Sequence, residues 1–249
     1  MDKYGLIGYP LRHSFSKQFF TEKFLREGID AVYENYEIAD ARMLLDIVKD
    51  NPELRGLNCT IPHKRAIIPL LDNISEEARE IGAVNVIRIQ RNSKGGCILE
   101  GYNSDYIGFK ESIKPLLKEN HRNALILGTG GASQAIRVAL THMGINWKYV
   151  SRNPREGILC YEDITSSLIQ QYEIIVNCTP VGMFPHIDEA PPLPYEALTE
   201  NHLLYDLVYN PDETLFLKRG AEQGAATKNG LEMLHLQAIA SWDIWNKDE

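Results

Sequence analysis

The chain has 249 residues, of which 44% are hydrophobic and 24% are charged, and its net charge at pH 7 is −8. This is the composition of an ordinary globular protein, long enough for one large domain or two modest ones. An acidic chain without basic runs is poorly suited to bind nucleic acid or a membrane surface, and no apolar run is long enough to cross a bilayer.

The cysteines and the N-terminus indicate where the protein works. Four cysteines, at positions 59, 97, 160 and 178, lie far apart without a Cys-x-x-Cys pair. This spacing argues against a zinc site and against a disulfide framework. The first residues, MDKYGLIGYP, lack the features of a signal peptide. We therefore expect a cytoplasmic protein without a bound metal.

Strand-like and helix-like segments alternate through the first part of the chain. Short apolar runs predict strands at 4–9, 31–38 and 56–61, and amphipathic runs predict helices at 16–28, 40–50 and 75–83. Such alternation is typical of βαβ units with a mostly parallel sheet. Residues 84–103 break the pattern, because two strand-like runs flank the turn NSKGG and predict a hairpin.

A second alternating series begins near residue 105. A helix is expected at 105–117, bent or ended by Pro115. Strands at 123–128, 148–152, 174–180 and 203–209 and helices at 130–144 and 229–247 follow. The two series predict two α/β lobes, residues 1–103 with 231–249 and residues 104–230, with a ligand cleft between them.

The segment LILGTGGASQAI (125–136) runs from an apolar strand through three glycines into a helix. Glycines let backbone N–H groups approach a pyrophosphate, and the helix N-terminus adds a partial positive charge. Ser133 stands where the Gly-x-Gly-x-x-Gly/Ala pattern has its third small residue. The segment predicts a dinucleotide-binding turn, and the alternative is a tight turn without a ligand.

The next predicted strand, KYVSR, ends in a basic residue instead of a carboxylate. An Asp or Glu at this place would hold the ribose hydroxyls of NAD, whereas an arginine suits the 2′-phosphate of NADP. Arg152, followed by Arg155, therefore indicates NADP; the alternative is a solvated surface arginine.

Other polar residues carry weaker signals. Ser14, Ser16 and Asp105 stand near predicted helix starts, where an N-cap role competes with ligand binding. Asn85 stands at the start of a predicted strand, where asparagine is unfavourable and a polar contact is expected. Lys64 follows the segment NCTIPH, and the alternative for it is a surface lysine. His63 and Cys59 are interpreted as packing residues.

Together and in this order, these segments resemble the shikimate dehydrogenase family. The matching segments run from residue 8 to 238 and are GYPLRHSFS, NCTIPHK, GAVNVI, GYNSDYIGF, LGTGGASQAI, VNCTPVGM, YDLVY and NGLEMLHLQA. The resemblance implies an α/β protein with an N-terminal mixed-sheet substrate lobe and a Rossmann-type NADP-binding lobe. It also implies a terminal helix that returns to the first lobe.

Position by position, the resemblance assigns roles to individual residues. The substrate carboxylate falls to Ser14, Ser16 and Tyr209, and the ring hydroxyls to Thr60, Lys64, Asn85, Asp105 and Gln237. The cofactor phosphates fall to Gly128, Thr129, Gly130, Gly131 and Ala132, the 2′-phosphate to Ser151 and Arg152, and the nicotinamide border to Leu207 and Gly230. The family's usual Asn-Arg-Thr is here Ser151-Arg152-Asn153, which leaves the strength of the NADP preference open.

The implied reaction reduces a ring ketone, 3-dehydroshikimate, to the alcohol of shikimate in chorismate and aromatic amino acid biosynthesis. Lys64 and Asp105 are the expected catalytic pair, because an ammonium stabilises and protonates the developing oxyanion. The alternatives are a quinate/shikimate dehydrogenase that accepts a further hydroxyl and NAD, and a non-catalytic dinucleotide sensor on the same fold. A small-molecule substrate is the expected partner, and either a monomer or a homodimer is compatible with the sequence.

Overall fold

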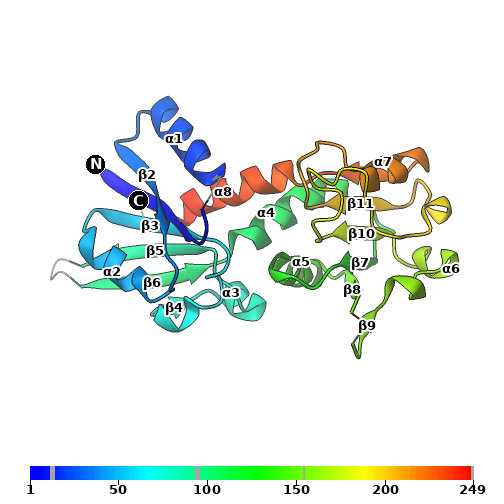
Figure 1. Ribbon diagram of the computed structural model, residues 1–249, viewed down its shortest axis with the longest axis horizontal. Helices are drawn as coiled ribbons and strands as arrows, with labels where there is room; N and C mark the ends of the chain where they lie inside the picture. The colour runs from blue at the N-terminus through cyan, green and yellow to red at the C-terminus, as the bar shows by residue number, and fades with distance from the viewer. Residues whose placement is uncertain (12–14, 93–95, 154, 248–249) are drawn as a thin grey trace. The chain divides into compact units, whose positions relative to one another are not determined.

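The computed structural model describes residues 1–11, 15–92, 96–153 and 155–247. Contacts divide the chain into two compact units, Met1–Ser104 with Ala238–Glu249, and Asp105–Gln237. Each unit contains one six-stranded sheet (Figure 1).

The first unit has a mixed sheet with the strand order β2-β1-β3-β5-β6-β4. Strand β1 is parallel to β2 and β3, β5 is antiparallel to β3 and β6, and β4 is parallel to β6. The strands are β1 (Asp2–Gly8), β2 (Ala31–Glu37), β3 (Leu54–Cys59), β4 (Asn73–Ile74), β5 (Val86–Arg91) and β6 (Cys97–Tyr102). The predicted hairpin is therefore confirmed as β5 and β6, while its tip, residues 93–95, lies outside the described residues.

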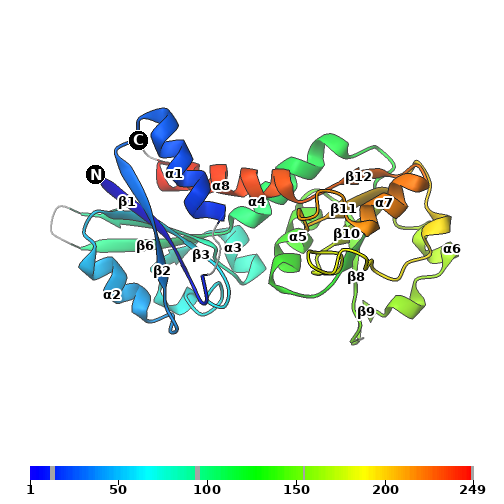
Figure 2. The same ribbon diagram turned by 45° about the horizontal axis from the view of Figure 1, so that its top comes forward.

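The connections of this sheet create a reversal of strand order. From β1 the chain passes through α1 (Phe15–Glu27) to β2, and then returns through α2 (Met43–Asp50) to β3 on the other side of β1. The two helices cover opposite faces of the sheet (Figure 2). In doubly wound sheets, ligands bind at the carboxyl ends of the strands where the order reverses. In this unit that point lies between β1 and β3.

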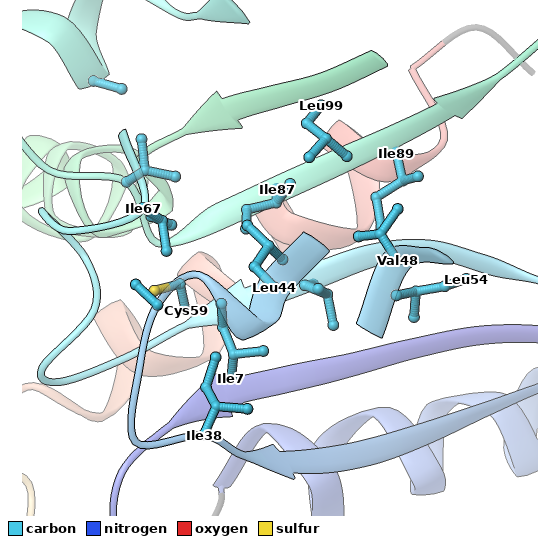
Figure 3. Close-up of a cluster of buried hydrophobic side chains, with 14 residues drawn as sticks. Ile7, Ile38, Leu44, Val48, Leu54, Cys59, Ile67, Ile87, Ile89 and Leu99 are labelled. Carbon is cyan, nitrogen blue, oxygen red and sulfur yellow. The ribbon is translucent and has the colours of Figure 1, made fainter. Parts of the chain in front are cut away.

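The two faces of the first unit's sheet are covered by different kinds of apolar side chain. On the α2 face, Leu44 and Val48 pack with Ile7, Leu57 and Ile87 in an aliphatic core (Figure 3). The other face is aromatic, and it joins α1 to the last helix, α8 (Leu231–Trp245). The rings of this cluster have centroids 4.8–5.9 Å apart in close pairs, and they belong to Tyr4, Phe20, Phe24, Tyr33, Trp242 and Trp245. The end of α8 thus completes the first unit's core.

The second unit has an entirely parallel sheet with the order β12-β11-β10-β7-β8-β9. Numbered from β7, this is the order 3-2-1-4-5-6 of a Rossmann fold. The strands are β7 (Asn123–Leu127), β8 (Asn146–Val150), β9 (Ile158–Leu159), β10 (Ile174–Asn177), β11 (Leu203–Asp206) and β12 (Ala226–Lys228). The order reverses between β7 and β10, which places a ligand site at the carboxyl ends of these strands.

Helices and short 3₁₀ segments complete the fold. The remaining α-helices are α3 (Glu76–Ile81), α4 (Ser104–Ile113), α5 (Gly131–His142), α6 (Ser166–Ile169) and α7 (Leu215–Glu222). The 3₁₀ segments are Ile68–Leu70, Lys114–Leu116, Tyr161–Asp163 and Tyr195–Ala197. Helix α4 ends at Ile113, before Pro115, as expected of a residue that cannot donate within a helix. Leu125, Val150, Ile175, Leu204 and Phe216 form the centre of this unit's core.

Several elements differ from the sequence-based expectation. Strands β4 and β9 have two residues each, too few for an alternating pattern to be visible. Strand β12 and helices α6 and α7 were also not predicted. Helix α2 begins at Met43 instead of residue 40, and β8, β10 and β11 end earlier than expected, because their last residues turn away into loops.

Candidate active site

In the first unit, the segments that follow β1 and β3 lie side by side at the point where the strand order reverses. Thr60 N–H donates to Ile7 O at 2.9 Å, and Tyr9 N–H donates to Ile61 O at 3.1 Å. These bonds hold the segment after β1 against the segment after β3. The first segment leads to Ser14, which lies outside the described residues, and to Ser16. Helix α1 begins at Phe15, so the N-cap interpretation of Ser16 is wrong.

The hairpin brings further polar residues to the same edge. Because β5 is antiparallel to β3, its first residue lies beside the end of β3, with Asn58 opposite Val86. Asn85 directly precedes β5, and β6 ends beside it with Tyr102 opposite Val86. The backbone of Lys64 is fixed to this edge, since Val84 N–H donates to Lys64 O at 2.7 Å. The topology thus gathers Ser16, Thr60, Lys64 and Asn85 at one edge of one sheet.

The side chain of Asn85 is buried and oriented by Ser104. Its Oδ1 accepts the backbone N–H of Ser104 at 2.7 Å, and its Nδ2 donates to Ser104 Oγ at 3.1 Å. These contacts use one of the two amide hydrogens. The second hydrogen has no hydrogen-bond partner among the described residues, and it is therefore available to a ligand oxygen.

Asp105 follows Ser104 and is the first residue of the second unit. Helix α4 begins at Ser104, so Asp105 lies in the first helical turn and is not the N-cap residue. The capping interpretation of Asp105 is therefore wrong. A carboxylate in the first turn still interacts favourably with the helix dipole.

In the turn that carries Thr60 and Lys64, some side chains are buried in the core and others are partly exposed to solvent. The Thr60 hydroxyl has no hydrogen-bond partner among the described residues, and both side chains are half-buried. Cys59 lies in the aliphatic core, where burial raises the pKa of its thiol to about 12. The ring of His63 is buried, with Nε2 2.7 Å from Ile38 O. Cys59 and His63 therefore support the turn from its buried side, and the Thr60 hydroxyl is available to a ligand.

The glycine turn of the second unit lies at the strand-order reversal of the Rossmann sheet. Gly128 follows β7 with φ +96°, a conformation that L side chains rarely adopt. Gly130 caps α5, a helix of 12 residues, and the space beside the Gly130 and Gly131 Cα atoms is open. Exposed backbone N–H groups and a helix N-terminus fit a pyrophosphate. Thr129 and Ala132 belong to the same accessible turn.

Ser133, the departure from the glycine pattern, lies at the buried side of this turn. Its hydroxyl donates to Gly130 O at 2.7 Å, and Tyr149 donates its hydroxyl hydrogen to Ser133 O at 3.2 Å. The third position of the pattern serves close packing of helix on strand. Ser133 fits there because it is small and its hydroxyl is satisfied locally, so the departure does not affect the ligand side of the turn.

The segments after β10, β11 and β12 converge beside the glycine turn. A side chain at Gly128 would meet Thr179 at 2.8 Å. Leu207 N–H donates to Asn177 O at 3.0 Å, which joins the ends of β10 and β11. A Cβ on Gly230 would lie 2.1 Å from Leu207 O, so only glycine allows these two backbones to approach. Leu207 and Gly230 are therefore neighbours at this edge.

A buried carboxylate supports these loops, and the sequence analysis missed it. Asp206 accepts hydrogen bonds from Thr214 Oγ1 at 2.6 Å, from Asn177 Nδ2 at 3.0 Å and from Val208 N–H at 3.0 Å. Burial raises the pKa of Asp206 to about 6, although the three donors oppose this shift. A charged residue inside the apolar run LLYDLV was the signal that could have identified it.

The segment after β8 explains the unusual Ser-Arg-Asn sequence. Ser151 Oγ accepts the backbone N–H of Asn153 at 3.2 Å, and Ser151 N–H donates to Leu159 O at 2.9 Å. The serine therefore closes a local turn that exposes Arg152 and Asn153. Arg152 lies close enough to Tyr161 to counteract in part the rise that burial causes in the pKa of this tyrosine. The turn leaves the guanidinium at the surface.

Two further expected residues belong to the second unit. Tyr209 is 45% exposed and follows β11 in the loop that begins with Leu207. Gln237 lies on α8, where its Nε2 donates to Leu234 O at 2.9 Å and its backbone packs against Gly108 of α4. Both side chains are accessible.

The described residues form neither a metal-ligand cluster nor a membrane-spanning helix. Among the described residues, no group of three or more His, Cys, Asp or Glu side chains is arranged to hold a metal ion. No helix formed by those residues is long and apolar enough to cross a membrane.

The strand order and the glycine turn define the second unit as a Rossmann-type dinucleotide-binding fold. Residues 6–87 match the family model "Shikimate dehydrogenase substrate binding domain". Shikimate dehydrogenase (NADP(+)) of Methanococcus aeolicus is 34% identical over 97% of this chain and 90% of the relative. The enzyme of the same description from Methanosphaera stadtmanae is 36% identical, with the same coverage.

Solved structures agree with these relatives. Shikimate dehydrogenase from Aquifex aeolicus has a TM-score of 0.83 at 33% identity, covering 100% of this chain and 94% of its own. Shikimate 5-dehydrogenase from Listeria monocytogenes, in complex with shikimate and NAD, has a TM-score of 0.89 at 29% identity, covering 100% and 93%. The 5-ketofructose reductase of Gluconobacter sp. strain CHM43 has a TM-score of 0.83 at 29% identity, covering 99% and 93%. The chain belongs to the shikimate dehydrogenase family.

Proposed function

We propose that this protein reduces 3-dehydroshikimate to shikimate with NADPH, and catalyses the reverse reaction with NADP. The observation that carries the proposal is the gathering of Thr60, Lys64 and Asn85 at one strand-order reversal, in a chain similar over its whole length to NADP-dependent shikimate dehydrogenases. The first unit, Met1–Ser104 with the end of α8, is the substrate-binding part. The second unit, Asp105–Gln237, is the cofactor-binding part.

The substrate is a small ring with a carboxylate and several hydroxyl groups, and the polar set fits its needs. Ser14, Ser16 and Tyr209 bind the carboxylate, and Thr60, Asn85 and Gln237 bind ring oxygens. The Thr60 hydroxyl and the second Asn85 amide hydrogen have no partners among the described residues, which supports these roles. A site built from such groups rejects a ligand that lacks the matching oxygen, because its buried polar groups would stay unpaired.

Lys64 and Asp105 act on the reacting carbonyl group. A nicotinamide cofactor, when bound, would supply the hydride for the carbonyl carbon. As the C=O π electrons move onto oxygen, the Lys64 ammonium stabilises the negative charge and transfers a proton to it, which gives the alcohol. Asp105 accepts hydrogen bonds from the lysine and from a ring hydroxyl, and it holds the two groups in register. In the reverse direction Lys64 takes the proton back.

The cofactor groups of NADP fit the second unit. The backbone of Gly128–Ala132 and the N-terminus of α5 receive the pyrophosphate. Arg152 binds the 2′-phosphate with its planar set of donors, and Ser151 and Asn153 shape the turn that presents it. Leu207 and Gly230, whose backbones approach closely, border the nicotinamide.

The decisive experiment follows the absorbance of NADPH after addition of 3-dehydroshikimate. We expect rapid loss of absorbance that depends on both compounds. In the reverse direction, shikimate with NADP should produce NADPH, whereas quinate and 5-ketofructose, each supplied with the appropriate cofactor form, should give little activity. Binding of NADPH without turnover of any of these compounds would contradict the proposal and favour a dinucleotide sensor. Comparable turnover of quinate with NAD would indicate a quinate/shikimate dehydrogenase.

A further inference from the structure

A chain of buried hydrogen bonds runs through the first unit between two of the proposed substrate contacts. It begins at Ser16, whose side chain lies close enough to the Tyr33 hydroxyl to oppose in part the rise that burial causes in the pKa of this tyrosine. Tyr33 donates its own hydroxyl hydrogen to Asn58 Oδ1 at 2.8 Å. Because that hydrogen is committed to Asn58, Ser16 is the donor toward the Tyr33 hydroxyl.

The chain continues from Asn58 to the last helix. Asn58 Nδ2 donates to Ser241 Oγ at 3.0 Å and to Asn85 O at 3.4 Å, which uses both amide hydrogens. Ser241 then donates its hydroxyl hydrogen to Ser104 Oγ at 3.2 Å. Ser104 is the residue that orients the Asn85 side chain, so the chain ends at the second substrate contact.

The members of this chain come from six places in the sequence. They belong to α1, β2, β3, the residue before β5, the start of α4 and the end of α8. Tyr33, Asn58, Asn85, Ser104 and Ser241 are at most 5% exposed. A buried hydroxyl or amide that loses its partner is costly to leave unpaired. The orientation of each member is therefore set by its neighbours, and Asn58 cannot turn its amide without losing donors and acceptors at both ends.

We propose that Tyr33, Asn58 and Ser241 are positioning residues that couple the two ends of the substrate site. This inference rests on the proposed function, which places Ser16 at the carboxylate and Asn85 at a ring hydroxyl. A rigid ring presents these groups at a fixed separation. A chain of satisfied hydrogen bonds holds Ser16 and Asn85 at a matching separation, so the ring is recognised as one unit.

The proposal gives Ser241 a role that its position alone does not reveal. Ser241 lies on the helix that completes the aromatic core, and its hydroxyl joins Asn58 to Ser104. Replacing it with alanine removes the central link and leaves the side chains that flank it in place. Asn58 Nδ2 then loses one of its two acceptors, and Ser104 Oγ loses a donor that helps to fix its direction.

The test compares Ser241→Ala with a matched control. Ser112→Ala, like Ser241→Ala, removes a buried serine hydroxyl from a helix. Ser112 lies in the second unit, where its hydroxyl is hydrogen-bonded to the buried Tyr205 at 2.6 Å. We expect Ser241→Ala to weaken shikimate binding in calorimetry by roughly two- to twelvefold, the effect of one hydrogen bond, with the KM for NADPH unchanged. Ser112→Ala should leave shikimate binding unchanged at a similar loss of stability.

A second pair keeps the test decisive if Ser241→Ala does not fold. Tyr33→Phe removes one oxygen from the chain, and Tyr205→Phe is its control; only the first should weaken shikimate binding. Combining Ser16→Ala with Tyr33→Phe or Ser241→Ala should weaken binding by less than the product of the single effects, because the chain is already broken.

Two results would overturn the proposal. One is wild-type shikimate affinity in Ser241→Ala and Tyr33→Phe, or an equal loss in their controls. The other is simple multiplication of the single effects in the double variants. Failure of the proposed function would be seen differently, as absence of 3-dehydroshikimate turnover and of shikimate binding in the wild-type protein.

Discussion

The segments Asn58-Cys59-Thr60 and Asn177-Cys178-Thr179 contain the same three residues and occupy corresponding places in the two sheets. The first lies at the end of β3 beside β1, and the second at the end of β10 beside β7, so both lie at strand-order reversals. Both asparagines and Cys59 are buried and Cys178 is partly buried, and burial raises the pKa of each thiol. The surroundings of the two segments, however, are different.

The asparagines differ in the charge of their partners. Asn58 is bonded to neutral groups, the hydroxyls of Tyr33 and Ser241 and a backbone carbonyl. Asn177 donates to the buried carboxylate of Asp206, which also holds Thr214. The first asparagine is thus part of a neutral chain, and the second belongs to a compact cluster around one acid.

The threonines differ in whether their hydroxyls are used. The Thr179 hydroxyl donates to Asn177 Oδ1 at 2.6 Å and accepts Val181 N–H at 3.3 Å. The Thr60 hydroxyl has no such partner within the described residues. In the second unit the threonine hydroxyl is therefore hydrogen-bonded within its own turn. In the first unit the threonine hydroxyl is available to donate to a ligand. The neighbouring strand and helix decide which, because they supply or withhold the partners.

The largest expected effect concerns the lysine of the first turn. Lys64→Ala should lower kcat on the order of 10²–10⁴-fold and change KM much less, because proton transfer matters chiefly in the transition state. Steady-state kinetics with 3-dehydroshikimate and NADPH measure the change. Lys49→Ala, on α2 of the same unit, is the control and should retain wild-type turnover. Near-normal kcat in Lys64→Ala would remove the lysine from the mechanism.

The next effect concerns the acid of the second turn. The pKa of Asp206 is raised from 3.8 to about 6 in the folded protein, so between these values the folded state binds more protons than the unfolded state. The contribution of Asp206 to stability therefore falls as pH rises from about 4 to 6, by about 3 kcal/mol, and is constant above.

Denaturant titrations across this pH range measure the contribution of Asp206 as the difference in the free energy of unfolding between the wild type and a variant. Compared with the wild type, Asp206→Asn should lack this fall in the free energy of unfolding. Asp188→Asn, which changes an exposed carboxylate, should follow the wild-type curve. Identical pH profiles for wild type and Asp206→Asn would show that the acid is ionised throughout, and the contrast between the two asparagines would lose its electrostatic basis.

A smaller effect is expected in the second unit, where Arg152 is the positive charge proposed to bind the 2′-phosphate. Charge-assisted hydrogen bonds from Arg152 to a 2′-phosphate should favour NADPH over NADH by about ten- to a hundredfold, less at high salt. Arg152→Ala should therefore raise the KM for NADPH and leave the weak activity with NADH nearly unchanged. Values of kcat/KM for both cofactors measure this. Equal losses with both cofactors would contradict the assignment and favour the quinate/shikimate alternative.

The smallest effect compares the two threonines directly. Thr60→Val should raise the KM for 3-dehydroshikimate by roughly two- to twelvefold and leave stability nearly unchanged, because the hydroxyl has no partner to lose among the described residues. Thr179→Val should lower the free energy of unfolding by about 1–3 kcal/mol, because Val181 N–H loses its acceptor. Kinetics and thermal unfolding of both variants decide this. A reversed pattern would mean that Thr60 is structural.

Local sequence patterns predicted the elements that depend on local physics. The helix at Glu76–Ile81 has Ser75 as its cap, accepting Ala78 N–H, and the left-handed Gly82 at its end, and both signals are visible in the sequence. The glycine turn and the hairpin were predicted for the same reason. The strand order was not visible, because it depends on which distant runs pair. The two reversals that place the sites therefore required the structure.

The candidate site was predicted unevenly. Thr60, Lys64 and Asn85 were identified through the family resemblance, and the structure adds that one sheet edge gathers them. Ser16 and Asp105 were weighed as helix caps, and neither is one. Asn58, Ser241 and Asp206 were missed, because a buried polar residue shows its purpose only through partners that lie far away in the sequence, such as Tyr33 or Thr214.

The first unit contains the end of helix α8, which is synthesised after the whole of the second unit. All residues of the second unit, Asp105–Gln237, are made before Ala238, whereas the first unit takes Ser241, Trp242 and Trp245 from later in the chain. On the ribosome the second unit can therefore gather its residues first, although the first unit begins the chain. Until its last helical turns emerge, the first unit exposes the aromatic side chains of α1 and β2, which makes the nascent chain a client for chaperones that bind apolar segments.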